Sequence, residues 1–283
     1  MKKGTLDIRV GGVGIRLEVA DESLLEACTK TYGLFIPGGA AEPEHRVVIT
    51  VSDSRQDVKE GDFSIGRVRG NEGYFILAPY FRGECSRDFS EGTLEILFAP
   101  NMEYLERAVE NYIRWALANI LLTSGRGLLL HASASVLDGQ AHVFLGPHGS
   151  GKSTAAILTT NGLMIADDVL PLLIERDGVK AAAMPAAGKF GQGRESSGSY
   201  PLGNLYWISK SENNCIEKLG KAPGVGLLMA SAPFIKETED YHCKLFESAS
   251  KILESAVLCN LHFRKEERFL DAALRNTAKE DNR

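Results

Sequence analysis

One run of eight residues constrains this chain more than any other. Residues 146–153 read Gly-Pro-His-Gly-Ser-Gly-Lys-Ser, which fits the pattern G-x-x-x-x-G-K-[ST]. Val143-Phe144-Leu145 before it is typical of a buried strand, and residues 154–158 continue as a helix. A glycine loop between a strand and a helix gathers backbone N–H groups around phosphate oxygens, and the helix adds its positive end. The sequence therefore predicts an α/β protein with a phosphate-binding loop.

Each part of this loop has a role in a nucleotide site. Lys152 supplies a positive charge for the β and γ phosphates, and the hydroxyl of Ser153 can ligate Mg²⁺. The backbone of the other positions surrounds the phosphates, and the side chain of His148 has no assigned role. The predicted nucleotide-binding residues are Gly146, Pro147, His148, Gly149, Ser150, Gly151, Lys152, Ser153 and Thr154. The alternative is a glycine turn with a surface lysine.

A pair of acids follows the next predicted strand, residues 163–166. About ten residues of helix descend roughly 15 Å from Lys152, and the strand returns at roughly 3.3 Å per residue. The right-handed crossover rule makes this strand parallel to the one before the loop. Asp167 and Asp168 should therefore reach the phosphates, one to hold Mg²⁺ and the other to take a proton from an attacking hydroxyl. Alternatively, Asp168 caps a turn and Asp167 is solvent-exposed.

A histidine is predicted near the same point. Residues 128–137 alternate, with His131, Ser133 and Ser135 on one face, and Asp138-Gly139 is typical of a two-residue hairpin. In that hairpin opposed residue numbers sum to 277, so His131 faces Gly146. It could ligate a metal or contact a phosphate there, or be a hydrogen-bonded core residue.

The chain divides into two predicted domains, residues 1–100 and 101–283. The first is β-rich and smaller: it has a hairpin over residues 6–19, a short helix capped by Asp21, and strands at 46–51 and 73–77. His45 and the Arg82–Arg87 pair are assigned to its surface. A helix over residues 102–122 opens the second domain, and another is expected over 237–258. Residues 263–274 should add a strand end and a short helix.

One segment is biased in composition. Residues 185–203 contain five glycines, three serines and two prolines, which predicts no regular element. It also carries Lys189, Arg194 and Glu195. We interpret it as a lid in which Lys189 or Arg194 stabilises charge on the transferred phosphoryl group. A charged connector is the alternative.

Composition excludes several classes of protein. The net charge of −5 gives no global attraction to nucleic acid or to anionic membranes. The five cysteines form no C-x-x-C pair, so neither a disulfide framework nor a zinc knuckle is indicated. The first residues lack the apolar segment of a signal peptide, and no apolar run is long enough to span a bilayer. We expect a reduced, cytoplasmic protein without nucleic-acid or membrane partners.

The run LLLHASASVLDGQAHVFLGPHGSGKST, followed by LMIADD, resembles the catalytic core of HPr serine kinase/phosphorylase and its relatives. It is also similar to the nucleotide core of ATP-dependent phosphoenolpyruvate carboxykinase. The resemblance implies a mixed-sheet P-loop core and phosphoryl transfer that depends on ATP and Mg²⁺. It assigns Asp167 as the catalytic carboxylate and Asp168 and His131, with Ser153, as metal ligands. In the carboxykinase pattern a lysine follows a hairpin after the paired Asp, and Lys189 takes that position here.

Three functions follow from these observations. The first is a kinase that transfers the γ-phosphoryl group to a hydroxyl of a protein, peptide or small molecule of unknown identity. The second is a non-catalytic ATP-binding regulator, favoured by Thr154, because the kinases usually carry Glu after the loop serine. The third is carboxykinase-like chemistry, which requires a cluster of arginines that the sequence does not display. Assembly into homo-oligomers rests on family analogy alone.

Overall fold

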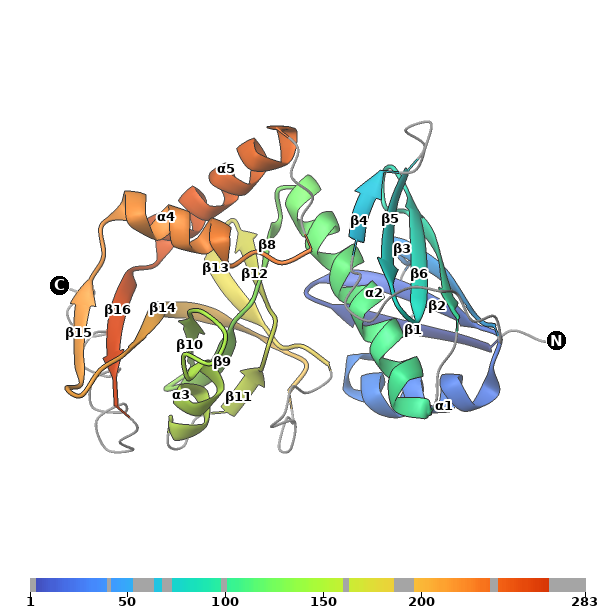
Figure 1. The fold of residues 1–283 in the computed structure, drawn as a ribbon, viewed down its shortest axis with the longest axis horizontal. Helices are drawn as coiled ribbons and strands as arrows, with labels where there is room; N and C mark the ends of the chain where they lie inside the picture. Colours follow the sequence, from blue (N-terminus) through green and yellow to red (C-terminus); the bar gives the residue numbers. More distant parts are fainter. Residues whose placement is uncertain are drawn as a thin grey trace. The chain divides into compact units, whose positions relative to one another are not determined.

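The structure, a computed structural model, describes residues 4–39, 42–52, 64–67, 73–97, 101–159, 163–185, 196–234 and 239–264. The protein is α/β with mixed sheets, and it forms two compact units (Figure 1). The first unit comprises Met1–Ile120 and Phe234–Glu237, and the second Leu121–Pro233 and Thr238–Arg283. The division falls inside helix α2 (Met102–Thr123), whereas the sequence placed a boundary at residue 100.

The first unit is built on one sheet in the strand order β1-β2-β3-β7-β6-β5-β4. The predicted hairpin is confirmed, because β1 and β2 pair antiparallel from Gly4↔Val19 to Val10↔Val13. Asp21 caps helix α1 (Glu22–Tyr32) by accepting from the N–H of Leu24 at 2.8 Å, and the 3₁₀ turn η1 (Gly33–Phe35) follows. The strands are β1 (Gly4–Val10), β2 (Val13–Val19), β3 (His45–Val51), β4 (Ser64–Arg67), β5 (Gly73–Ala78), β6 (Phe81–Ser86) and β7 (Glu91–Ile96).

Helix α2 belongs with this sheet over most of its length. Trp115 meets Phe89 and Tyr112 edge-on, with ring centroids 6.0 and 5.5 Å apart. A Cβ placed on Gly83 of β6 would lie 2.6 Å from the Tyr112 ring, so the helix approaches strand backbone that carries no side chain. This packing explains why the compact unit extends past residue 100, through residue 120 of the helix.

The assignment of His45 to the surface was wrong. Its side chain is fully buried in the first unit. Nδ1 lies 2.6 Å from the Phe89 carbonyl oxygen, and Nε2 lies 3.1 Å from the Tyr112 hydroxyl. A buried imidazole is tolerated when both nitrogens have partners, and neither partner is adjacent to His45 in the sequence. Arg82 and Arg87 are exposed, as expected.

The second unit is built on a larger mixed sheet in the order β11-β9-β10-β14-β13-β12-β8, extended by β16 and β15 beyond β14. Helix α3 packs on β9 and β10, α5 packs on β8, β12 and β13, and α4 packs on α5. The strands are β8 (Gly127–Leu130), β9 (Ser133–Leu137), β10 (Gln140–Leu145), β11 (Leu163–Ala166), β12 (Leu170–Glu175), β13 (Gly178–Ala182), β14 (Ser199–Lys210), β15 (Cys215–Lys218) and β16 (Leu258–Phe263). The helices are α3 (Lys152–Leu158), α4 (Lys221–Ala230) and α5 (Glu239–Ser255).

The hairpin of β9 and β10 has the predicted register. Its pairs run from Gln140↔Leu137 to Phe144↔Ser133. Asp138 and Gly139 both have positive φ, 51° and 81°, as the turn of such a hairpin requires. β11 pairs antiparallel with β9, so it runs in the same direction as β10 with β9 between them. The sense expected from the crossover rule is confirmed, although the two strands are not neighbours.

Two expectations about the rest of the unit change, and others fall outside the described residues. Residues 185–203 were predicted to be irregular, but Ser199 opens the twelve-residue strand β14, because its residues gain partners on β10, β13 and β16 that are distant in sequence. The helix expected over 237–258 ends at Ser255, and Leu258 begins β16. Lys189, Arg194, Glu195 and the expected terminal helix lie outside the described residues. Among the helices of the described residues, none has both the length and the apolar character needed to span a membrane.

Candidate functional site

The glycine loop, residues 146–151, joins the end of β10 to the start of α3. Gly146, Gly149 and Gly151 have φ values of 143°, 72° and 105°, in the region that favours glycine. The N–H of Ser150 donates to the Pro147 carbonyl at 3.2 Å, and Ala155 N–H donates to the Gly151 carbonyl at 2.8 Å. The loop therefore turns tightly and leads directly into the first turn of the helix.

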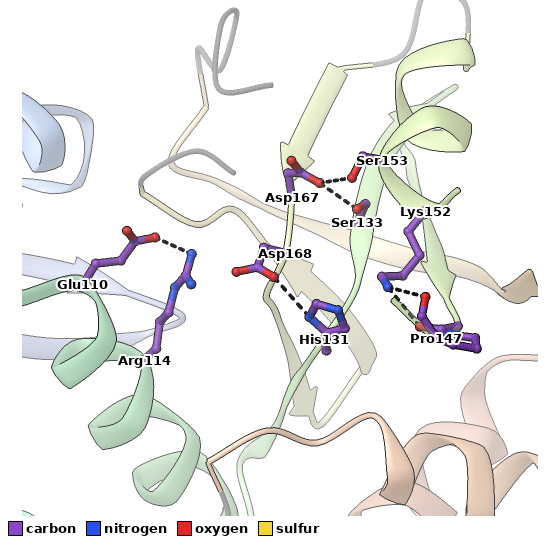
Figure 2. Close-up of polar contacts among 10 residues, drawn as sticks. Glu110, Arg114, His131, Ser133, Pro147, Lys152, Ser153, Asp167 and Asp168 are labelled. Atoms are coloured by element: carbon purple, nitrogen blue, oxygen red, sulfur yellow. Dashed lines mark hydrogen bonds and ion pairs between the residues drawn. The ribbon is translucent and has the colours of Figure 1, made fainter. Parts of the chain in front are cut away.

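Lys152 lies inside this turn. Its side chain is only 7% exposed, and Nζ donates to the carbonyl oxygens of Gly146 at 2.9 Å and Pro147 at 3.1 Å (Figure 2). Burial lowers the pKa of Lys152, while the negative charges of Asp168 and Asp167 act in the opposite direction. The ammonium group is thus held by neutral carbonyls that an anionic ligand could replace.

Asp167 is the buried member of the acid pair, at 4% exposure. Its Oδ1 accepts hydrogen bonds from the hydroxyls of Ser153 at 2.6 Å and Ser133 at 2.9 Å. β11 shifts register between Met164 and Ala166, which is where a bulge can re-aim the side chains that follow. The alternative in which Asp167 is solvent-exposed is wrong, because the carboxylate is held between β9 and the first turn of α3.

Asp168 faces a different partner. Its Oδ1 lies 3.2 Å from Nδ1 of His131, and the two side chains are 42% and 38% exposed. The φ of Asp168 is 86°, a conformation that costs about 1 kcal/mol or more for a residue other than glycine. The backbone is fixed on both sides, since Ala132 N–H donates to the Asp168 carbonyl at 3.1 Å and His131 N–H to the Ser231 carbonyl at 2.7 Å.

The hairpin register alone does not explain the place of His131. Pairing between β9 and β10 ends at Ser133, so His131 is not opposite Gly146 in a continuous ladder. The contact with Asp168 brings it to the site instead. Figure 2 shows the His131–Asp168 pair beside Lys152 and the Asp167–serine contacts.

The structure gathers five of the side chains predicted for the site and adds Ser133, to which the sequence assigned no role. Ser133 was placed on the same face as His131 by the alternation of β9, which was the available signal for its contact with Asp167. Ser150 is 8% exposed, and its buried Oγ has no hydrogen-bond partner among the described residues. The gathered residues are His131, Lys152, Ser153, Asp167 and Asp168; Lys189, predicted to be catalytic, lies outside the described residues.

The donor set suits a hard divalent cation. Ser153, Asp167 and Asp168 offer hydroxyl and carboxylate oxygens, the ligands that Mg²⁺ prefers. His131 offers an imidazole nitrogen, which also suits softer transition metals. These residues fit a metal-bound phosphate, with the metal near Ser153 and the acid pair and the phosphates near Lys152.

Comparison with known proteins gives little evidence of a shared ancestry from which a function could be inferred. No family model matches the chain, and no curated protein matches its sequence. Among solved structures, the HPr(Ser) kinase/phosphatase from Coxiella burnetii is a weak structural neighbour. It has a TM-score of 0.35 and 13% identity, and the match covers 55% of this chain and 99% of that one. Any relationship is distant, so the function is argued from the site's own chemistry.

Proposed function

We propose that this protein is a phosphotransferase that uses ATP and Mg²⁺ and delivers the γ-phosphoryl group to a hydroxyl acceptor. One observation carries the proposal: Ser153, next to Lys152 in the first turn of α3, donates to Asp167, and both Asp167 and its neighbour Asp168, which pairs with His131, act electrostatically on Lys152. A loop that only bound phosphate would not need two carboxylates, because negative charge near a phosphate is unfavourable without a cation. The acids therefore support a metal-assisted reaction on a P-loop core of the HPr kinase type.

The chain's own residues divide the work. Lys152 exchanges its carbonyl partners for β- and γ-phosphate oxygens. Ser153, Asp168 and His131 would hold Mg²⁺, which would neutralise charge on the phosphates. Asp167 takes the proton of the acceptor hydroxyl through Oδ2, because both of its hydrogen bonds to described residues fall on Oδ1. Lys189 remains the proposed charge-stabilising group of the segment that follows β13.

Exposure favours a second assignment of the two acids. Asp168 is half exposed and could meet an acceptor directly, whereas Asp167 is buried beside the serine proposed to ligate the metal. In this alternative, Asp167 supports the metal through Ser153 and Asp168 is the base, with its position fixed by His131. The two assignments require the same reaction and differ in which variant loses metal affinity.

The reaction is tested with γ-labelled ATP, Mg²⁺ and a panel of hydroxyl-bearing peptides, proteins and small metabolites. The expected result is label on one acceptor class, absent without Mg²⁺ and absent in Lys152→Ala. Label transfer that continues unchanged in both Asp167→Asn and Asp168→Asn would remove the carboxylate base from the proposal. Phosphate release into water with no labelled acceptor in any fraction would indicate a hydrolase instead.

A non-catalytic regulator is the alternative function. It is favoured by the closed contacts of the site, in which Lys152 is satisfied by the loop and Asp167 by two serines. Such a protein binds ATP with Mg²⁺, gives no product, and changes its size or partner when the nucleotide binds. Equilibrium binding of a fluorescent ATP analogue, followed by size-exclusion chromatography with and without ATP, distinguishes this from turnover.

A further inference from the structure

A second cluster of chemically active side chains lies on the outer strand pair of the second unit. Cys215, Glu217 and His262 have their ligand atoms within 4.8 Å of one another. The nucleotide site has no part in this cluster, because Cys215 and Glu217 belong to β15 and His262 to β16. We propose that these three residues form a binding site for a divalent transition metal of the Zn²⁺ class.

Strand pairing places the three side chains on one face. Cys215 and His262 are direct partners in the antiparallel pair of β15 and β16, and Glu217 is opposite Asn260. Residues two apart in a strand point to the same side, so Glu217 stands beside Cys215, and Asn260 beside His262. The opposite face of β16 is buried, because Cys259, Leu261 and Phe263 belong to the hydrophobic core. The cluster is therefore on the open face of a well-supported strand.

The imidazole is already oriented. Asn260 Nδ2 lies 2.9 Å from His262 Nε2, and Ser209 Oγ donates to Asn260 Oδ1 at 2.9 Å. Because an amide nitrogen only donates, Nε2 accepts, and its lone pair is the one that a metal would take over from Asn260. Glu217 Oε2 lies 3.5 Å from the same nitrogen. Two acceptor atoms, Nε2 of His262 and Oε2 of Glu217, thus lie 3.5 Å apart, and a cation between them could bind both.

The donor set determines the class of metal. A thiolate, an imidazole and a carboxylate are the three protein ligand types of zinc sites, with bonds of about 2.0–2.3 Å. In a tetrahedron with such bonds the donors lie about 3.5 Å apart, so the present separation closes with small rotamer changes. Mg²⁺ and Ca²⁺ prefer oxygen ligands and would not use the sulfur. Three protein ligands leave a fourth position for water.

The cysteines of the chain allow a matched experiment. Cys28, Cys85 and Cys259 are buried, while Cys215 and Cys243 are exposed. Burial raises the pKa of the Cys28 thiol to about 12 and that of Cys85 further, so these thiols do not supply a thiolate in the folded chain. Cys243 lies on α5 and does not belong to the cluster of Cys215, Glu217 and His262, so Cys243→Ser is the control for Cys215→Ser.

The full chain, reduced and freed of metal with a chelator, is titrated with Zn²⁺ in the presence of excess Mg²⁺, and separately with Co²⁺. The expected result is one Zn²⁺ per chain and, with Co²⁺, a thiolate-to-metal charge-transfer absorption. Cys215→Ser abolishes this absorption and weakens Zn²⁺ binding at least about tenfold. Glu217→Gln and His262→Gln weaken binding in the same direction, and Cys243→Ser leaves affinity and absorption unchanged.

Two outcomes would overturn the site. One is the absence of stoichiometric Zn²⁺ binding to the wild-type chain. The other is a charge-transfer absorption that persists in Cys215→Ser or disappears in Cys243→Ser. Because Cys215 is exposed, its substitution by serine decides the matter even where His262→Gln impairs folding. The result is independent of phosphoryl transfer, since the readout is binding and the nucleotide site contributes no thiol among its described residues.

Discussion

The two units bury polar side chains in different ways. In the first, His45 is enclosed: Nδ1 lies against the Phe89 carbonyl oxygen and Nε2 against the Tyr112 hydroxyl, which also lies 3.2 Å from the Glu84 carbonyl oxygen. In the second, the buried Lys152 and Asp167 are each followed in the sequence by a half-exposed residue, Ser153 and Asp168, so this polar site borders solvent. A polar group satisfied wholly within a core serves stability, whereas one that borders solvent can exchange its partners for a ligand.

Substitutions of Asp167 and Asp168 should have the largest effects, and they test whether the polar groups of the second unit serve a reaction and not only stability. Asp167→Asn should lower the transfer rate about 10²- to 10⁴-fold with little change in Mg²⁺ affinity, because it removes the base. Asp168→Asn should instead raise the Mg²⁺ concentration needed for half-maximal rate. Initial rates measured across a Mg²⁺ series for both variants check this. The reverse pattern would exchange the roles of the two acids, and normal rates in both would make the pair structural.

Lys152→Ala comes next in expected effect. Removing the ammonium group should lower the rate of phosphoryl transfer about 10²- to 10³-fold, because the loss of one hydrogen-bond donor to the charge that develops in a transition state has an effect of this size. ATP affinity, followed by calorimetry, should fall as well. Lys251→Ala, at an exposed position on α5, is the matched control and should leave both unchanged. An unaltered ATP affinity in Lys152→Ala would contradict the phosphate role of the loop.

His142 tests whether the second unit also contains a polar side chain that is enclosed in the core, as His45 is in the first unit. Burial lowers the pKa of His142 to about 4, opposed only by Asp138. Below pH 6.5, the ordinary pKa of histidine, His142 binds a proton in the unfolded chain but not in the folded chain. The free energy of unfolding therefore decreases as the pH falls from 6.5 to about 4. Between pH 7 and pH 5 this loss should be about 2 kcal/mol for wild type, and His142→Phe should lack it.

Urea unfolding at the two pH values measures this difference. The chain has two tryptophans, Trp115 in the first unit and Trp207 on β14 of the second. A Trp115→Phe background therefore reports the second unit by fluorescence. Equal pH dependence with and without His142 would show that the imidazole is accessible to solvent protons.

The smallest effect is expected from Tyr112→Phe. Loss of the Tyr112 hydroxyl should destabilise the first unit by about 1–2 kcal/mol, because it leaves the buried Nε2 of His45 without a donor. ATP binding should not change.

The counterpart in the second unit is Ser133→Ala, which should lower the rate of phosphoryl transfer while the first unit keeps its stability. Trp115 fluorescence in a Trp207→Phe background follows the first unit, and a fall in ATP affinity of Tyr112→Phe would contradict the separation.

The local features of the fold were predictable because their causes lie within a few residues. The turn at Asp138-Gly139 needs only two residues that accept positive φ, and it set the register of β9 and β10. The cap at Asp21 needs only a side chain that reaches Leu24. The glycine loop likewise carries its own conformational requirements in Gly146, Gly149 and Gly151. Such signals operate over short distances and survive without tertiary context.

The burial of His45, the cross-strand triad on β15 and β16, and the strand that begins at Ser199 were not predictable in this way. Each depends on a partner in another strand or loop, which is Phe89 for His45, His262 for Cys215 and Ala182 for Ser199, and the sequence gives no distance between them. The site combines both cases. The sequence itself determined which residues can bind phosphate and metal, through the chemistry of the loop, the acid pair and the histidine. Only the tertiary structure decided that Asp167 meets Ser153 while Asp168 meets His131, because the register shift of β11 and the positive φ of Asp168 direct the two adjacent carboxylates to different partners.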